Sequence, residues 1–105
     1  MALPDVAPAA NSRGRGVLGL NVVIPTPLID YTDGARELVA HGASLDAVLR
    51  DLDRQYPGIR FRMIDEQGGV RPHIKLFVDR ELERDLSVSV VNAHELLVVA
   101  ALSGG

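Results

Sequence analysis

The chain has 105 residues, a formal net charge of −3 and no cysteine. This length allows one domain with a real core but not two, and the small acidic excess argues against binding to nucleic-acid phosphates. The absence of cysteine excludes disulfides, thiolate zinc sites and a thiol nucleophile.

Residues 1–16 are expected to form a disordered arm, because Pro4 and Pro8 interrupt their few apolar positions. The arm has no positively charged start followed by an apolar block, which a secretory signal requires. The longest apolar run, residues 96–102, is far shorter than the roughly 20 residues of a membrane helix. We therefore expect no membrane segment and a cytoplasmic location.

Residues 14–19 contain glycines at the spacing of a dinucleotide-binding loop, at Gly14, Gly16 and Gly19. Such a loop follows a strand and opens a helix, and here no strand precedes it. Instead, the residues around and after it are apolar at every second position, at Leu18, Leu20, Val22 and Ile24. This period is typical of a half-buried strand, so the segment predicts a first strand and not a nucleotide site.

Pro25 and Pro27 end this strand, because proline has no backbone donor for a sheet ladder. The dipeptide Asp33-Gly34 suits a turn with positive φ, and residues 35–42 can return as a second strand. The two strands are expected to form a hairpin at the N-terminal edge of the domain.

Residues 44–56 predict a helix that begins at Ser44, whose hydroxyl can cap free backbone N–H groups. Its apolar positions form one stripe, made by Leu45, Val48, Leu49, Leu52 and Tyr56. Pro57 and Gly58 end it. The opposite face is interpreted as solvated surface without an active site, and its residues are Asp46, Arg50, Asp53 and Arg54.

The second half of the chain predicts strands at residues 74–78, at residues 88–90 and from Glu95 onward, with a turn at residues 92–94. Residues 59–69 fit either a short helix or a tucked loop, and this is left open. The first and last strands are strongly apolar, as central strands are, and can pair in parallel. One helix against one face of a mixed sheet is an α+β design.

Several segments in this order resemble the ubiquitin-like sulfur-carrier proteins: "VVIPTPL", a turn with "DG", "ASLDAVLRDLDRQYPGI", "DEQG", "HIKLFVDRE" and a terminal Gly-Gly. The family includes the thiamine-pathway carrier and the small subunit of molybdopterin synthase. The resemblance covers residues 18–105 and is greatest to the longer carriers of cysteine synthesis and of natural-product clusters.

The resemblance implies a β-grasp fold over residues 17–105, with a mixed sheet of four to five strands, one main helix and a flexible tail. It also implies that Gly105, preceded by Gly104, carries the reactive carboxylate. An adenylating enzyme of the ubiquitin-activating type would use ATP on this carboxylate, and a sulfur donor would convert it to a thiocarboxylate. The chain itself would be a covalent carrier and not an enzyme, and would bind no cofactor or metal.

Further partners follow from the same resemblance. They are a sulfur-accepting synthase, either cysteine synthase-like or from a natural-product pathway, and a metalloprotease that trims the tail. Alternative functions are the small subunit of molybdopterin synthase, a ubiquitin-like modifier joined to lysines, and a small binding domain whose tail has no role.

Elementary chemistry agrees with the implied role of the tail. The carboxylate at the end of a peptide ionises at a pH of about 3.3–3.7 and is inert at neutral pH, so it needs activation before a nucleophile can attack it. Glycine has no Cβ, which lets a tail enter a narrow channel. The sequence departs from the family at residues 92–94, where an acidic-glycine turn is usual, and at Ser103, which is expected to influence partner choice.

Alternation along the last strands places Phe77, Leu97 and Val99 together on the sheet face away from the helix, with Lys75 beside them. Such an apolar patch often marks a protein interface, and we predict that it binds the partners together with Ser103. The alternative is that the loop around Phe61 and Met63 folds over the patch.

The remaining polar candidates are interpreted as ordinary surface or turn residues. The histidines are spaced too widely for a metal site, at His41, His73 and His94. Asp65 and Glu66 fall in a predicted turn, with nothing to make either an acid or a base.

Overall fold

A computed structural model describes residues 19–101. The elements in chain order are β1 (Leu20–Val23), the 3₁₀ helix η1 (Thr26–Thr32), β2 (Glu37–Ala40), α1 (Leu45–Gln55), α2 (Ile59–Met63), β3 (Ile74–Val78), β4 (Glu81–Glu83) and β5 (Glu95–Ala100). The predicted arm at residues 1–16 and the predicted Gly-Gly tail lie outside the described residues. Among residues 19–101, no helix has the length and apolar character needed to cross a membrane.

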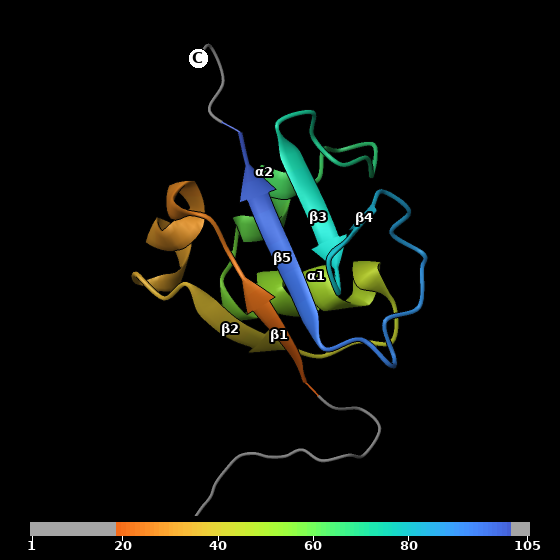
Figure 1. The fold of residues 1–105 in the computed structure, drawn as a ribbon. Helices are drawn as coiled ribbons and strands as arrows, with labels where there is room; N and C mark the ends of the chain where they lie inside the picture. The colour runs from red at the N-terminus through yellow and green to blue at the C-terminus, as the bar shows by residue number, and fades with distance from the viewer. Residues whose placement is uncertain (1–18, 102–105) are drawn as a thin grey trace, which may run out of the picture.

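The five strands form one mixed sheet in the order β2-β1-β5-β3-β4, and the helices pack against one of its faces (Figure 1). β1 and β5 pair in parallel, and the other neighbouring strands pair antiparallel. The predicted α+β class and the parallel pairing of the first and last strands are therefore confirmed. This topology makes β5 the central strand.

The first two strands are antiparallel, as predicted, with Leu20 opposite Ala40 and Val23 opposite Glu37. The connection is not a tight hairpin, because the 3₁₀ helix η1 fills it. Asp33, with φ 56°, and Gly34, with φ 90°, end η1 in the left-handed region. The Asp-Gly pair thus forms the predicted positive-φ turn. It follows the 3₁₀ helix η1, however, which the sequence analysis did not predict.

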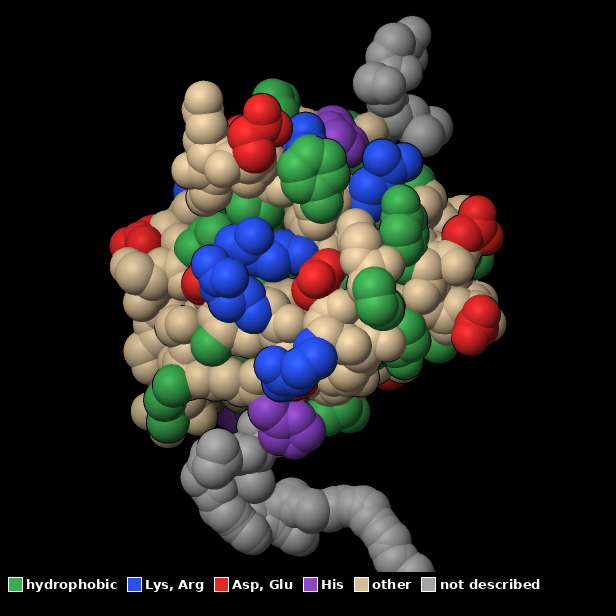
Figure 2. Space-filling model, turned by 180° about the vertical axis from the view of Figure 1, so that it is seen from behind, with side chains coloured by type: hydrophobic (Ala, Val, Ile, Leu, Met, Phe, Trp, Pro, Cys, Tyr) green, Lys and Arg blue, Asp and Glu red, His purple; other side chains and the backbone are tan. Residues whose placement is uncertain are grey.

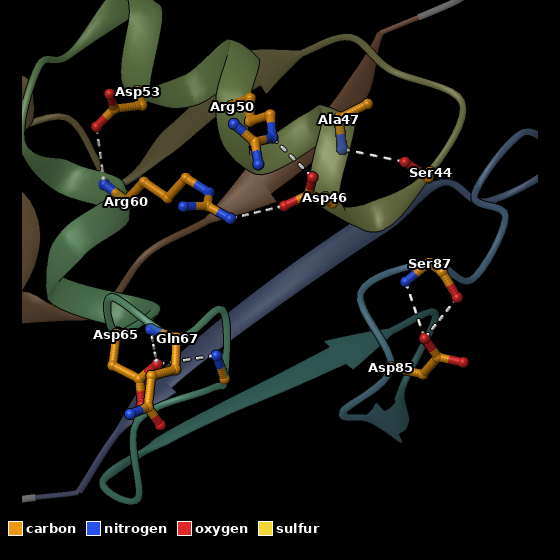
Figure 3. Close-up of polar contacts among 11 residues, drawn as sticks. Ser44, Asp46, Ala47, Arg50, Asp53, Arg60, Asp65, Gln67, Asp85 and Ser87 are labelled. Carbon is orange, nitrogen blue, oxygen red and sulfur yellow. Dashed lines mark hydrogen bonds and ion pairs between the residues drawn. The ribbon is translucent and has the colours of Figure 1, made fainter.

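The main helix α1 matches its prediction closely. Ser44 is the N-cap, and its side chain accepts a hydrogen bond of 3.1 Å from the Ala47 N–H (Figure 3). The predicted apolar stripe is fully buried at Leu45, Val48, Leu49 and Leu52. Tyr56 is partly buried against the same core. Burial of this stripe is what holds the helix on the sheet, since an isolated helix of this length is marginal in water.

The polar face of α1 is not simply solvated, which corrects the interpretation above. Asp53 Oδ1 accepts the N–H groups of Gly58, at 3.0 Å, and of Arg60, at 3.1 Å, and so supports the start of α2. Asp46 accepts from Arg60 Nη2 at 2.8 Å and from Arg50 Nε at 2.7 Å (Figure 3). The hydrogen bond from Arg50 holds the pKa of Asp46 below its usual value. These acids connect the two helices.

Residues 59–69, whose type the sequence left open, form the short helix α2 and then a turn closed by a bridge between Ile64 and Val70. Ile59, Met63 and Ile64 are fully buried in the core. The short helix is therefore fixed by its apolar side chains.

The predicted short strand at residues 88–90 is wrong, because that segment forms only a single bridge, between Ser89 and Ser44. The backbone of this segment is hydrogen-bonded to the start of α1. The Leu45 N–H donates to the Val88 carbonyl, and the Val90 N–H donates to the Ala43 carbonyl. The short strand is instead β4, reached through a turn with positive φ at Asp79 and Arg80. Non-glycine residues seldom adopt this conformation, so the sequence does not indicate the turn.

Asp51 is a buried carboxylate on α1, with 8% of its surface exposed. Its Oδ2 accepts the backbone N–H of His41 at 2.9 Å and Gln55 Nε2 at 3.0 Å, and Arg54 pairs with Oδ1. Burial alone would raise its pKa, but the hydrogen bonds from His41 and Gln55 and the charge of Arg54 together lower it. The ionised form therefore stabilises the contact between α1 and the end of β2.

We expect Asp51→Asn to lower the free energy of unfolding at pH 7 by about 1.5–3 kcal/mol, the range for hydrogen bonds to a charged group. Because the native pKa lies below the unfolded value of about 3.9, the advantage of the native chain is present above that pH. It should disappear as the pH falls through the native pKa. Urea unfolding of both chains from neutral to acidic pH measures this, with the exposed Asp30→Asn as control. An equal loss in the control would contradict the prediction.

Candidate functional site

The end of β5 is where the predicted tail begins. β1 pairs with β5 only over residues 95–97, whereas β3 pairs with it from Leu96 to Ala100. The last residues of β5 therefore have β3 as their only strand neighbour among the described residues. The Ala101 N–H donates to the His73 carbonyl at 2.8 Å, one residue beyond the strand. This hydrogen bond continues the pairing up to the last described residue.

The predicted reactive residues follow this point directly in the sequence. Gly104 and Gly105, and the predicted partner-binding residue Ser103, lie outside the described residues. The structure does describe β5, the strand that precedes them. β5 pairs with both β1 and β3 near its start and, among the described strands, with β3 alone at its end.

The sheet face opposite α1, called here the outer face, carries an apolar row that crosses four strands. Phe77 of β3 lies opposite Leu97 of β5 and Leu82 of β4. Leu97 in turn lies opposite Val23 of β1. These four residues are the apolar row, and Val99, opposite Lys75, extends it toward the end of β5. Leu82 is 49% exposed and Val99 is 38% exposed, so the face is open to contact.

The predicted grouping of Phe77, Leu97 and Val99 beside Lys75 is thus confirmed as an arrangement. The alternative, that the loop around Phe61 and Met63 covers the patch, is wrong. Met63 is fully buried in the core, and both helices lie behind the sheet when the outer face is in front (Figure 1). The role of these residues in binding a partner stays a prediction.

Sequence reasoning missed two members of the row. Val23 is an outward position of the first strand, and extending the alternation of its buried neighbours Val22 and Ile24 would have found it. Leu82 could not be placed because β4 was not predicted.

The other polar candidates lie apart from this face or serve the backbone. His41, His73 and His94 are exposed. In the described part of the chain, no group of three or more His, Cys, Asp or Glu side chains could hold a metal ion. Asp65 Oδ1 accepts the N–H groups of Gln67 and Gly69, each at 2.9 Å, and these bonds lower its pKa (Figure 3). Asp65 is therefore a turn residue, as the sequence indicated.

Asp79 explains how the chain manages without an acidic-glycine turn before β5. Its Oδ1 accepts the N–H groups of His94, at 2.9 Å, and of Glu95, at 3.0 Å. These hydrogen bonds, chiefly the one from His94, keep its pKa below the ordinary value. A carboxylate from the β3 to β4 turn thus fixes the start of β5, a role that the sequence did not reveal.

Comparison with known proteins shows what the chain is similar to. No family model matches the chain. The sulfur carrier protein CysO of Mycobacterium tuberculosis (strain ATCC 25618 / H37Rv) is 29% identical over 93 residues, which are 84% of this chain and the whole of that protein. This similarity to CysO supports the predicted resemblance to the ubiquitin-like sulfur carriers. The predicted closeness to the cysteine-type carriers is confirmed with it.

Two solved structures are similar to the chain over most of its length. The crystal structure of the Amycolatopsis orientalis BexX/CysO complex matches with a TM-score of 0.74 and 27% identity, over 82% of this chain and 99% of that chain. SAMP1 from Haloferax volcanii matches with a TM-score of 0.70 and 20% identity, over 83% of this chain and 99% of that chain. The second likeness shows the fold alone, and together they confirm the predicted β-grasp architecture.

Proposed function

We propose that this chain is a sulfur carrier whose Gly105 carboxylate is adenylated, converted to a thiocarboxylate and used as a sulfur donor in the biosynthesis of cysteine. The observation that carries the proposal is the similarity to CysO over the entire length of that protein. The chain acts as a covalent co-substrate and does no catalysis of its own.

The chemistry runs through the carboxylate and needs no side chain of the carrier. An ionised carboxylate is a poor electrophile, so its oxygen first attacks the α-phosphate of ATP on the activating enzyme, and pyrophosphate leaves. A sulfide-level donor then attacks the carbonyl carbon of the acyl-adenylate, AMP departs, and the C–S bond of the thiocarboxylate remains. ATP is a substrate of the activating enzyme and not a cofactor of this chain.

The outer face supports a contact with the enzymes that load and unload the tail. Phe77 and Leu97 lie in the middle of the apolar row, and Val99, one residue before the end of β5, extends the row toward the tail. An apolar patch beside a reactive terminus lets one docking event both bind the body and direct the tail. The partners are a ubiquitin-activating-type adenylating enzyme and a synthase that accepts the sulfur.

The alternative functions have less support. Similarity to SAMP1 concerns the fold and gives no argument for a protein modifier. A small subunit of molybdopterin synthase would co-purify stably with a large subunit, and a modifier would form isopeptide bonds with lysines. Neither outcome is expected.

The test is intact-mass analysis of the full chain after incubation with the adenylating enzyme of the same organism, ATP and a sulfide source. The expected product is heavier by the difference between one sulfur and one oxygen atom, and it forms only when ATP is present. A chain that gains no sulfur from an enzyme shown to be active on another carrier would refute the proposal.

A further inference from the structure

A groove lies beside the point where the chain leaves the sheet, on the helix side of the molecule. It has a volume of about 470 Å³ and is formed by η1, α2 and the ends of β3 and β5. Its lining includes Leu28, Phe61, Arg62, Arg71, Ile74 and Ala101, and we call it the tail-root groove. Figure 2 shows basic and apolar side chains next to each other at the upper end of this side. The groove is separate from the outer face.

The floor of the groove is apolar, because Leu28 and Ile74 are buried core residues that reach its base. Phe61 forms part of the wall and is 53% exposed. An aromatic ring so exposed on a short helix gains little from the core. Its position instead gives the groove an apolar contact surface next to its charges.

Arg71 is held in one orientation at the rim. Its Nε donates to the Phe61 carbonyl at 2.7 Å, and its guanidinium carbon lies 4.4 Å from the centroid of the Phe61 ring. Among residues 19–101, no hydrogen bond or salt bridge involves its two terminal nitrogens. Because the side chain is already ordered, a carboxylate that binds them in the bidentate geometry costs little further conformational entropy.

The two arginines at this groove form no salt bridge within the described chain. The other arginines of the helical region form salt bridges: Arg50 and Arg60 with Asp46, and Arg54 with Asp51. In residues 19–101, Arg62 and Arg71 form none. The nearby Asp65 carboxylate accepts backbone N–H groups of its own turn, and the positive charge of Arg71 adds to these bonds in lowering its pKa without forming a salt bridge. A positive groove thus stands out on a chain whose net charge is −3.

We propose that the tail-root groove binds an acidic segment of the adenylating enzyme, with a carboxylate on Arg71 and Arg62 and an apolar side chain against Phe61. This inference rests on the proposed function, since it names the surface by which the loading enzyme holds the carrier next to the tail. Charge complementarity selects this occupant, because carboxylates match the two guanidinium groups. The groove includes Ala101, the last described residue, so this contact places the enzyme beside the segment that precedes the terminal glycines.

The experiment measures direct binding of the full chain to the adenylating enzyme without ATP, by titration calorimetry at two salt concentrations. Arg71→Glu is expected to weaken binding about tenfold or more, and Arg62→Glu somewhat less. The matched control is Arg80→Glu, an equal charge change at an exposed residue beyond the opposite end of β3. Native binding should weaken with added salt, and binding of the Arg71 variant should weaken less.

The outcomes distinguish the groove inference from the proposed carrier function. If Arg71→Glu and Arg80→Glu weaken binding equally, or neither does, the groove inference is overturned while sulfur loading of the native chain still supports the carrier function. If the native chain binds through Arg71 but gains no sulfur, the carrier function falls and the groove stands. If the native chain neither binds nor is loaded, both fall. If added AMP competes with the enzyme for the native chain but not for the Arg71 variant, the groove binds a nucleotide phosphate and the acidic-segment proposal is wrong.

Discussion

A chain that lacks Gly105 is expected to stay folded and to gain no sulfur. The deletion removes one residue, which shortens the reach of the tail by about 3.3–3.6 Å. A nucleophile must lie within about 3–3.5 Å of its target for reaction, so the new terminal carboxylate on Gly104 would stop short of the α-phosphate of ATP. Loading should fall below detection in the intact-mass assay. The fold should persist, because the deletion lies beyond residues 19–101, which form the complete sheet and core.

A second variant tests whether the position of the terminal carboxylate matters in addition to its being carried by a glycine. Adding one glycine after Gly105 restores a glycine carboxylate but places it one residue too far, and loading should again be lost. Thermal unfolding and far-UV circular dichroism of both variants should match those of the native chain. Sulfur transfer to either variant at the native rate would show that the position of the terminal carboxylate is not decisive.

The sequence predicted the parts of the fold that local periodicity determines. Ser44 as a cap, the buried stripe with Leu49 at its centre, and the alternation in β3 and β5 each depend on a short window of residues. The parallel pairing of β1 and β5 could also be predicted, because both strands are apolar enough for the middle of a sheet. These features depend on hydrophobic burial, which a sequence displays directly.

The wrong or missing predictions concern features that depend on long-range or unusual backbone geometry. β4 depends on positive φ values at Asp79 and Arg80, two residues that give no glycine signal. Val88 and Val90 pack on the core, and their backbone groups bond to the segment that starts α1. In the sequence, the same two apolar residues are typical of a strand. Arg60 reaches Asp46 from the next helix, so a face that is polar in α1 alone becomes a contact between helices.

In the candidate site, too, the features set by local periodicity could be predicted and those set by long-range contacts could not. The arrangement of Phe77, Leu97 and Val99 could be predicted because the alternation of two strands fixes it, whereas Leu82 needed the unpredicted β4. The tail-root groove was not predicted, because it combines η1, α2 and two strand ends that meet only in the folded chain. The proposed reactive residue, Gly105, was named from the resemblance, because the chain has no cysteine and its described residues hold no metal cluster that would indicate the chemistry.

The outer face gives the second large expected effect: Phe77→Asp should weaken binding to the adenylating enzyme by roughly thirtyfold or more, the loss of about 2 kcal/mol that defines a hot spot. Phe77 touches the row on both sides, at Leu97 and Leu82, so a carboxylate there would be desolvated in the complex without a partner. Calorimetric titration of the two proteins measures the change.

The substitution also removes a half-buried aromatic ring, so a loss of binding must be separated from a loss of folding. Val99→Asp serves this purpose, because Val99 is already 38% exposed and its replacement costs the free chain little. It should weaken binding severalfold while the unfolding midpoint stays near the native value. The control is Val91→Asp, which is 57% exposed and lies in the loop before β5, away from the row. Equal binding by the native chain and Val99→Asp, together with unchanged binding by a folded Phe77→Asp, would mean that the enzyme does not bind the outer face.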